Sequence, residues 1–124
     1  MATIKHFKEL NSWRSALLLF QALHSRFRTS PKLRREYELK NQIIRASLSI
    51  MNNIAEGFGR KSNKEFLRFL SIARGSCFEV ESMIYAMDST RLISPSELED
   101  YLEHISSIKG NLAGLSKYLH SISK

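Results

Sequence analysis

The sequence contains little of what cross-links or interrupts a chain. Its 124 residues include 1 Cys, 2 Pro and 5 Gly. A single Cys excludes a disulfide within the chain and favours the reducing environment of the cytoplasm. Because Cys77 falls within an apolar helical stripe, we expect it to be a buried core residue. The scarcity of Pro and Gly favours long, uninterrupted helices.

The sequence also lacks long apolar runs. The longest, Ala16–Phe20, is far shorter than the ~20 residues of a membrane-spanning helix. Residues 1–6 lack the apolar core of a secretory signal peptide. We therefore expect a cytoplasmic protein without a membrane partner.

What the sequence does contain is helical periodicity. Apolar residues recur at spacings of three and four over residues 10–27, 36–56, 62–87 and 94–122. The hydrophobic content of 43% is enough for a core, and the length fits a single domain, residues 1–124. Because the loops between these segments are short, consecutive helices should be antiparallel neighbours. The sequence therefore predicts an all-α, up-down-up-down four-helix bundle.

The helix ends carry recognisable signals. Ser62 with Glu65, and Ser94 with Glu97, have the spacing of a capping box. Pro95 occupies the favoured first helical position. The glycines at positions 57 and 59 are expected to end the second helix by adopting the left-handed conformation.

The helices carry more apolar surface than one bundle core needs. The second and third helices each have an additional apolar stripe beside the one expected to face the core. The additional stripes comprise Ile44, Leu48, Met51 and Ala55, and Leu67, Phe78 and Tyr85. Because large apolar remainders usually mark interfaces, we expect a homo-oligomer larger than a dimer.

The formal net charge of +7 is unevenly placed along the chain. Residues 1–35 carry eight Lys and Arg against Glu9 alone, whereas the remaining residues carry eleven of each sign. A basic N-terminal surface attracts RNA, DNA or anionic lipid, although a solvated face that only aids solubility would look the same. The candidate nucleic-acid-binding residues are those around the break between the first two helices and those preceding the third: Arg28, Lys32, Arg34, Arg35, Arg60 and Lys61.

The patterns needed for catalysis are missing. The segment 57–62 lacks the spacing of a phosphate-binding loop and follows a helix instead of a strand. None of the four His residues follows a carboxylate at the Glu-x-x-His spacing of bundle metal sites. No Arg stands four to six residues before a His, the spacing of some helical RNA-cutting toxins. We therefore expect no enzyme, no metal, no cofactor and no small-molecule substrate.

A run of residues at the end of the second helix and in the third resembles a known family. The matching strings are Asn53-Ile54-Ala55-Glu56-Gly57, Gly59-Arg60, Phe66-Leu67-Arg68-Phe69-Leu70, Ile72-Ala73-Arg74-Gly75-Ser76 and Glu79, with Phe7, Leu10 and Trp13 at the start. They resemble the bacterial four-helix-bundle proteins encoded in intervening sequences of 23S rRNA genes. The family often has Pro before the Asn-rich stretch, where this chain has Met51-Asn52, and this departure puts a local helix bend in doubt.

The resemblance implies an up-down bundle that assembles into a ring-shaped homo-oligomer, a pentamer. It also points to a related protein, the accessory protein of diversity-generating retroelements, which is basic and works with nucleic acid and a reverse transcriptase. Resemblance transfers fold and assembly better than it transfers function.

Several polar residues of these strings need an explanation. We interpret them as a polar clamp that fixes the register of the second and third helices through buried charge pairs; the alternative is a ligand site. The clamp residues are Asn53, Glu56, Arg60, Arg74 and Glu79. Together, residues and resemblance predict a non-enzymatic, oligomeric binding protein that associates with RNA or DNA. The alternative is a structural or protein-interaction scaffold with an incidental basic face.

Overall fold

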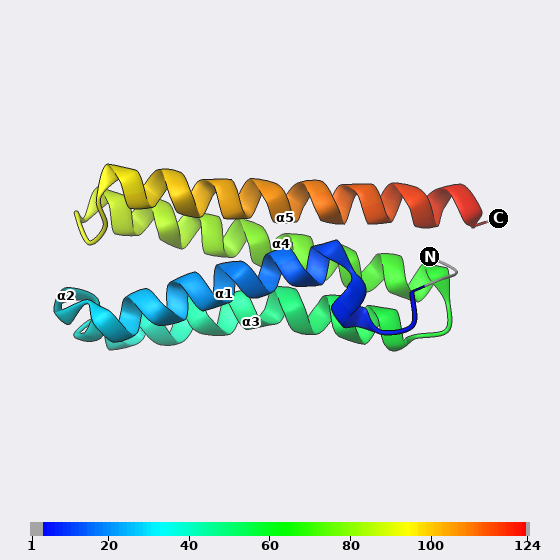
Figure 1. Cartoon of the computed structure of the whole chain (residues 1–124), viewed down its shortest axis with the longest axis horizontal. Helices are drawn as coiled ribbons and strands as arrows, with labels where there is room; N and C mark the ends of the chain where they lie inside the picture. Colours follow the sequence, from blue (N-terminus) through cyan, green and yellow to red (C-terminus); the bar gives the residue numbers. More distant parts are fainter. Residues whose placement is uncertain (1–3, 124) are drawn as a thin grey trace.

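A computed structural model describes residues 4–123 and contains four long helices (Figure 1). They are α1 (Asn11–Thr29), α3 (Tyr37–Gly59), α4 (Asn63–Ser89) and α5 (Pro95–Ile122). A short 3-10 helix, η1 (Phe7–Glu9), precedes α1, and a single turn, α2 (Pro31–Arg34), separates α1 from α3. The described residues contain no strand, and consecutive long helices run in opposite directions. The predicted all-α, up-down-up-down arrangement is confirmed for these residues; positions 1–3 and 124 of the expected domain lie outside them.

The core lies between the four long helices. Each contributes fully buried apolar side chains at three- and four-residue spacing, among them Leu19, Ile50, Ile84 and Ile108. Cys77 is also fully buried, and burial raises the pKa of its thiol to about 12. The predicted core role of this cysteine is confirmed.

Most predicted helix starts agree with the structure. The Ser94 side chain accepts a bond from the Glu97 N–H at 3.1 Å, and the Glu97 carboxylate accepts one from the Ser94 N–H at 2.9 Å. At α4 only the first half of the box is seen, with the Ser62 side chain accepting from the Glu65 N–H at 3.3 Å. Pro95 is the first residue of α5.

The prediction for the glycines at the end of α3 is wrong. No glycine among the described residues has a positive φ, and Gly57 is a buried position within the helix. A Cβ built on Gly57 would lie 2.8 Å from the Phe69 Cβ and 2.9 Å from the Phe66 Cδ1. Gly57 is therefore needed because it has no side chain, which lets α3 approach α4 closely, and not because it adopts a left-handed conformation.

A left-handed residue does occur at the end of α4. Arg91 has a φ of 60°. The Leu92 N–H donates to the Met87 carbonyl at 2.9 Å, and the Arg91 N–H donates to the Asp88 carbonyl at 3.0 Å. This is the Schellman pattern, in which two carbonyls of the last helical turn are satisfied.

Candidate nucleic-acid interface

Polar contacts between helices mark one level across the middle of the bundle. The hydroxyls of Ser49 and Ser76 are 2.9 Å apart and join α3 to α4. The Asn111 amide donates to the Ser15 hydroxyl at 3.0 Å and joins α5 to α1. The Lys109 amine of α5 also lies at this level, above the Phe78 ring of α4. The level divides the described residues into two halves with very different charge.

The first half contains α2 and comprises residues 16–49 and 77–110; we call it the α2 half. Apart from Lys109, it carries eight basic and nine acidic side chains. The basic ones are Arg26, Arg28, Lys32, Arg34, Arg35, Lys40, Arg45 and Arg91. The acidic ones are Glu36, Glu38, Glu79, Glu81, Asp88, Glu97, Glu99, Asp100 and Glu103. The basic corner predicted from the sequence is therefore surrounded by enough acid to neutralise it.

Two cations beside or within this corner make contacts inside the chain. Arg26 of α1 forms a salt bridge with Glu97 of α5. Burial raises the pKa of the Glu97 carboxyl, but the bonds from the Arg26 guanidinium and from the Ser94 N–H lower it, and the net shift is downward. The Lys32 amine donates to the Arg91 carbonyl at 2.8 Å. Among the described residues, Arg28, Arg34 and Arg35 form no salt bridge, so the acids of this half balance the corner overall instead of pairing with each cation.

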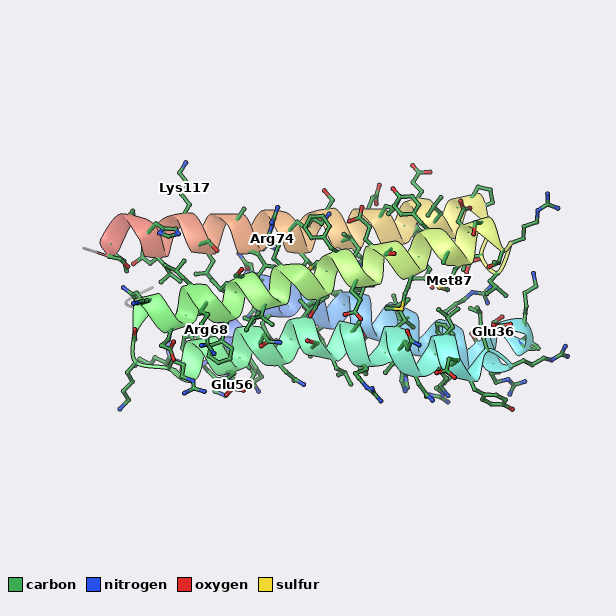
Figure 2. All side chains as sticks on the ribbon, turned by 180° about the vertical axis from the view of Figure 1, so that it is seen from behind. Glu36, Glu56, Arg68, Arg74, Met87 and Lys117 are labelled. Atoms are coloured by element: carbon green, nitrogen blue, oxygen red, sulfur yellow. The ribbon has the colours of Figure 1, made fainter. Side chains whose placement is uncertain are left out.

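The second half comprises residues 4–15, 50–76 and 112–123; we call it the cationic half. It carries nine basic side chains against three acidic ones. The basic ones are Lys5, Lys8, Arg14, Arg60, Lys61, Lys64, Arg68, Arg74 and Lys117, and the acidic ones are Glu9, Glu56 and Glu65. Figure 2 shows Arg68, Arg74 and Lys117 in this half and Glu36 at the opposite end of the bundle. The excess positive charge of the described residues is therefore gathered here.

The structure separates the candidate nucleic-acid-binding residues into two groups. Arg28, Lys32, Arg34 and Arg35 lie around α2, whereas Arg60 and Lys61 lie between α3 and α4 at the other end of the bundle (Figure 1). The helix α3 between them is 23 residues long, which corresponds to roughly 34 Å. These six side chains therefore do not converge on one short ligand.

Sequence reasoning missed the basic residues of α4 and α5. Residues 36–124 are balanced overall, but the cations of α4 lie in its first half and that of Lys117 lies in the second half of α5. Because the two helices are antiparallel, these segments meet at the same end. The order of charges along each helix, combined with the predicted topology, is the signal that would have found them.

The predicted polar clamp is also corrected. Glu56 and Arg60 form an exposed pair along α3 at 2.9 Å, instead of a buried pair between helices. Exposed pairs at this spacing contribute only about 0.3–0.5 kcal/mol. Arg74 and Glu79 are exposed on α4. Of the five residues, only Asn53 takes part in the polar contact between α3 and α4, by donating to the Ser49 carbonyl at 2.8 Å and to the Ser49 hydroxyl at 3.1 Å.

Two phenylalanines of α4 hold cations against their rings. Phe69 is buried, and the guanidinium carbons of Arg60 and Arg68 lie 5.1 and 5.3 Å from its ring centroid. Phe78 is 47% exposed, and Arg74 and Lys109 lie over its ring. Both of these aromatic rings of α4 therefore have cations beside them, and these cations come from α4 itself, from the end of α3 and from α5.

The grooves between helices contain fewer features that suggest chemistry. A groove of about 550 Å³ between α1 and α5 is lined by Tyr101, His104 and the Arg26–Glu97 pair. Burial raises the pKa of the Tyr101 hydroxyl to about 12. Within residues 4–123, no group of three or more His, Cys, Asp or Glu side chains is placed to hold a metal ion. None of the described helices is long and apolar enough to cross a membrane.

Comparison with known proteins places this bundle in a family. The family model described as "23S rRNA-intervening sequence protein" matches residues 8–114. Among solved structures, a protein of unknown function from the S23 ribosomal protein family of Bacteroides thetaiotaomicron has 22% sequence identity and a TM-score of 0.77. The similarity covers 86% of this chain and 95% of that chain, and at this identity it shows the fold alone. Among curated proteins, none matches this chain. Because the family model spans most of the sequence, as the resemblance indicated, the chain belongs to the 23S rRNA-intervening sequence protein family.

Proposed function

We propose that this protein is a non-enzymatic, homo-oligomeric protein that binds RNA or DNA through its cationic half. The observation that carries the proposal is the segregation of charge, with nine basic and three acidic side chains in the cationic half and, once Lys109 is counted, nine of each sign in the α2 half. A polyanion is attracted to the cationic half, whereas the α2 half has no net charge to attract it. Nucleic acid would therefore contact one end of the bundle.

The distribution of cations within this half favours an extended ligand. Arg60, Lys61, Lys64 and Arg68 follow the end of α3 and the first turns of α4, and Lys5 and Lys8 precede α1. A ligand with many phosphates can neutralise several of these at once and release their counterions. A single small anion would use few of them.

Self-association would strengthen such binding. In the second apolar stripe of α3, Met51 is buried in the core, but Ile44 and Leu48 are only partly buried and line an open groove of about 700 Å³. Leu18 of α1 is 54% exposed. We propose that contacts of this kind hold a ring of copies together. A ring with its bundles side by side would gather the cationic halves on one face and multiply weak contacts by avidity.

The proposal is tested with two matched triple variants. One replaces Lys61, Lys64 and Arg68 with Glu in the cationic half, and the other replaces Lys32, Arg34 and Arg35 with Glu in the α2 half. Both change the net charge equally. Affinity for a short labelled RNA is measured by fluorescence anisotropy at several salt concentrations, and the size of each assembly by sedimentation equilibrium.

The cationic-half variant should bind RNA at least tenfold more weakly and show a flatter dependence on salt, because each lost phosphate contact lowers the slope by about 0.7–0.9. The α2-half variant should lose less affinity. Equal losses in both variants would refute the assignment to the cationic half. Absence of wild-type binding at low salt would refute the nucleic-acid function and leave the scaffold alternative, and a monomer at micromolar concentration would refute the oligomer.

A further inference from the structure

Phe78 is an aromatic ring that the fold leaves open to solvent between two cations. Its neighbours along α4, Cys77 and Val80, are fully buried, but Phe78 itself is 47% exposed. Single exposed apolar side chains are common and need no explanation on their own. The feature that distinguishes Phe78 is the pair of cations that α4 and α5 hold against it.

Each cation is held in place by the fold. The Arg74 guanidinium carbon lies 5.0 Å from the Phe78 ring centroid, one turn earlier on α4, and Arg74 extends toward α5 (Figure 2). The Lys109 amine of α5 lies 4.0 Å from the same centroid and forms a salt bridge with Glu81. Among the described residues, Arg74 has no carboxylate partner, so its charge is available to a ligand.

The comparison with Phe69 shows why Phe78 is suited to a ligand. Both rings have two cations beside them, but Phe69 is only 8% exposed and its ring is used in packing. Phe78 offers the same combination at the surface. An exposed aromatic ring combined with nearby cations is the arrangement by which proteins bind single-stranded nucleic acid, with bases stacked on rings and phosphates on cations.

We propose that Phe78 is a stacking site for an unpaired nucleobase of single-stranded RNA or DNA, with the unpaired Arg74 binding the adjoining phosphate. Lys109 stays paired with Glu81 and packs against the ring. The proposal rests on the nucleic-acid function proposed above and adds a preference for single strands. From Phe78 the strand would follow α4 toward Lys61, a path of roughly 26 Å along basic side chains. A duplex cannot use the ring in this way, because its bases are already stacked on one another. Every base has an aromatic face, so little sequence preference is expected.

The test compares Phe78→Leu with Tyr85→Leu. Tyr85 lies two turns further along α4 and is 48% exposed, but among the described residues no cation lies over its ring as Arg74 and Lys109 lie over that of Phe78, so its variant is a matched control for loss of an exposed ring. Affinities for labelled single-stranded RNA, single-stranded DNA and an RNA duplex are measured by anisotropy at low salt. The fluorescence of a single strand containing 2-aminopurine reports stacking directly, and circular dichroism verifies that both variants remain folded.

Phe78→Leu should weaken binding of both single strands about tenfold and abolish the quenching of 2-aminopurine, while duplex affinity stays the same. Tyr85→Leu should change neither. Equal effects on single strands and duplex, or no effect of Phe78→Leu on a wild type that binds, would overturn the stacking site while leaving the proposed function standing. A changed sedimentation coefficient with unchanged affinity would identify Phe78 as a contact between copies instead. If wild type binds none of the three probes, both proposals fail.

Discussion

The close approach of α3 to α4 at Gly57 makes Gly57→Ala a sensitive test of the packing. The new methyl group would lie 2.8 Å from the Phe69 Cβ and 2.9 Å from the Phe66 Cδ1. Carbon atoms in contact are normally 3.5–4.0 Å apart. The Phe66 ring can rotate slightly, but the Phe69 Cβ is attached to the backbone, so relief requires α4 to move away from α3.

Two effects of opposite sign decide the magnitude. Replacing Gly by Ala within a helix stabilises by about 1 kcal/mol, whereas overpacking a tight contact destabilises by about 1–3 kcal/mol. Because a backbone shift is needed, we expect a net loss of about 1–2 kcal/mol in the free energy of unfolding. For 124 residues this corresponds to a Tm lower by roughly 4–8 °C.

The matched control for this prediction is Gly75→Ala. Gly75 is exposed within α4, and a Cβ there would meet no atom within 4 Å. This variant should gain up to about 1 kcal/mol from helix propensity alone. Urea and thermal unfolding of the two variants measure the difference. If Gly57→Ala is stabilised as much as Gly75→Ala, the packing explanation for this glycine is wrong.

Two further predictions follow from particular contacts. Arg91→Gly should raise the free energy of unfolding by about 1 kcal/mol, because a left-handed φ is costly for any residue with a Cβ; Arg91→Ala, which keeps the Cβ, should show no such gain in the urea midpoint. Glu97→Gln keeps the side-chain cap but loses the charge that pairs with Arg26. Because the pKa of Glu97 is lowered in the folded protein, the pair stabilises above the unfolded pKa of about 4.3, and its contribution is lost as pH falls through the folded pKa. The difference between wild type and Glu97→Gln, at most about 1 kcal/mol for a partly exposed pair, should therefore shrink in acid, and a difference that grows there would contradict this reasoning.

Periodicity was sufficient to predict the helices because their stripes are long and regular. The segments predicted at 36–56 and 94–122 correspond to α3 at 37–59 and α5 at 95–122. The α2 turn was not predicted, because Ser30-Pro31 indicates both the end of one helix and the start of another: the Ser30 hydroxyl caps the turn by accepting from the Leu33 N–H at 3.2 Å. Gly57 was misjudged because composition cannot distinguish a glycine needed for a left-handed turn from one needed for close packing.

The candidate site was harder to predict than the fold, because its contacts depend on which residues of different helices lie beside one another in the bundle. Glu56 and Arg60 are four residues apart, so a pair along one exposed helical face was available to them without any contribution from α4. Conversely, the contact that does join α3 to α4 is made by two small hydroxyls, Ser49 and Ser76, which carry no sequence signal of their own. The net charge of residues 36–124 is likewise uninformative, because it does not show that the antiparallel α4 and α5 place their basic segments at the same end of the bundle.

The neutralised basic corner yields a final prediction. Asp100 and Glu103 lie on the first turns of α5, in the half that contains Arg28, Arg34 and Arg35. At 0.1 M salt, charges interact over about 10 Å, so these acids reduce the attraction of a polyanion to the corner. The double variant Asp100→Asn, Glu103→Gln should therefore bind short RNA severalfold more tightly than wild type at low salt, and the gain should disappear as salt rises.

The double variant changes shape very little, so any gain in affinity reports charge alone. Anisotropy titrations of wild type and variant at several salt concentrations measure the gain, and the same titrations on a variant that also carries Arg34→Glu and Arg35→Glu show whether it arises at the corner. An affinity that stays at the wild-type value in low salt, in a protein that binds RNA, would mean that the acids of α5 are too far from the corner to mask it. In that case the two groups of basic residues would act alike, and the cationic half would lose its special role.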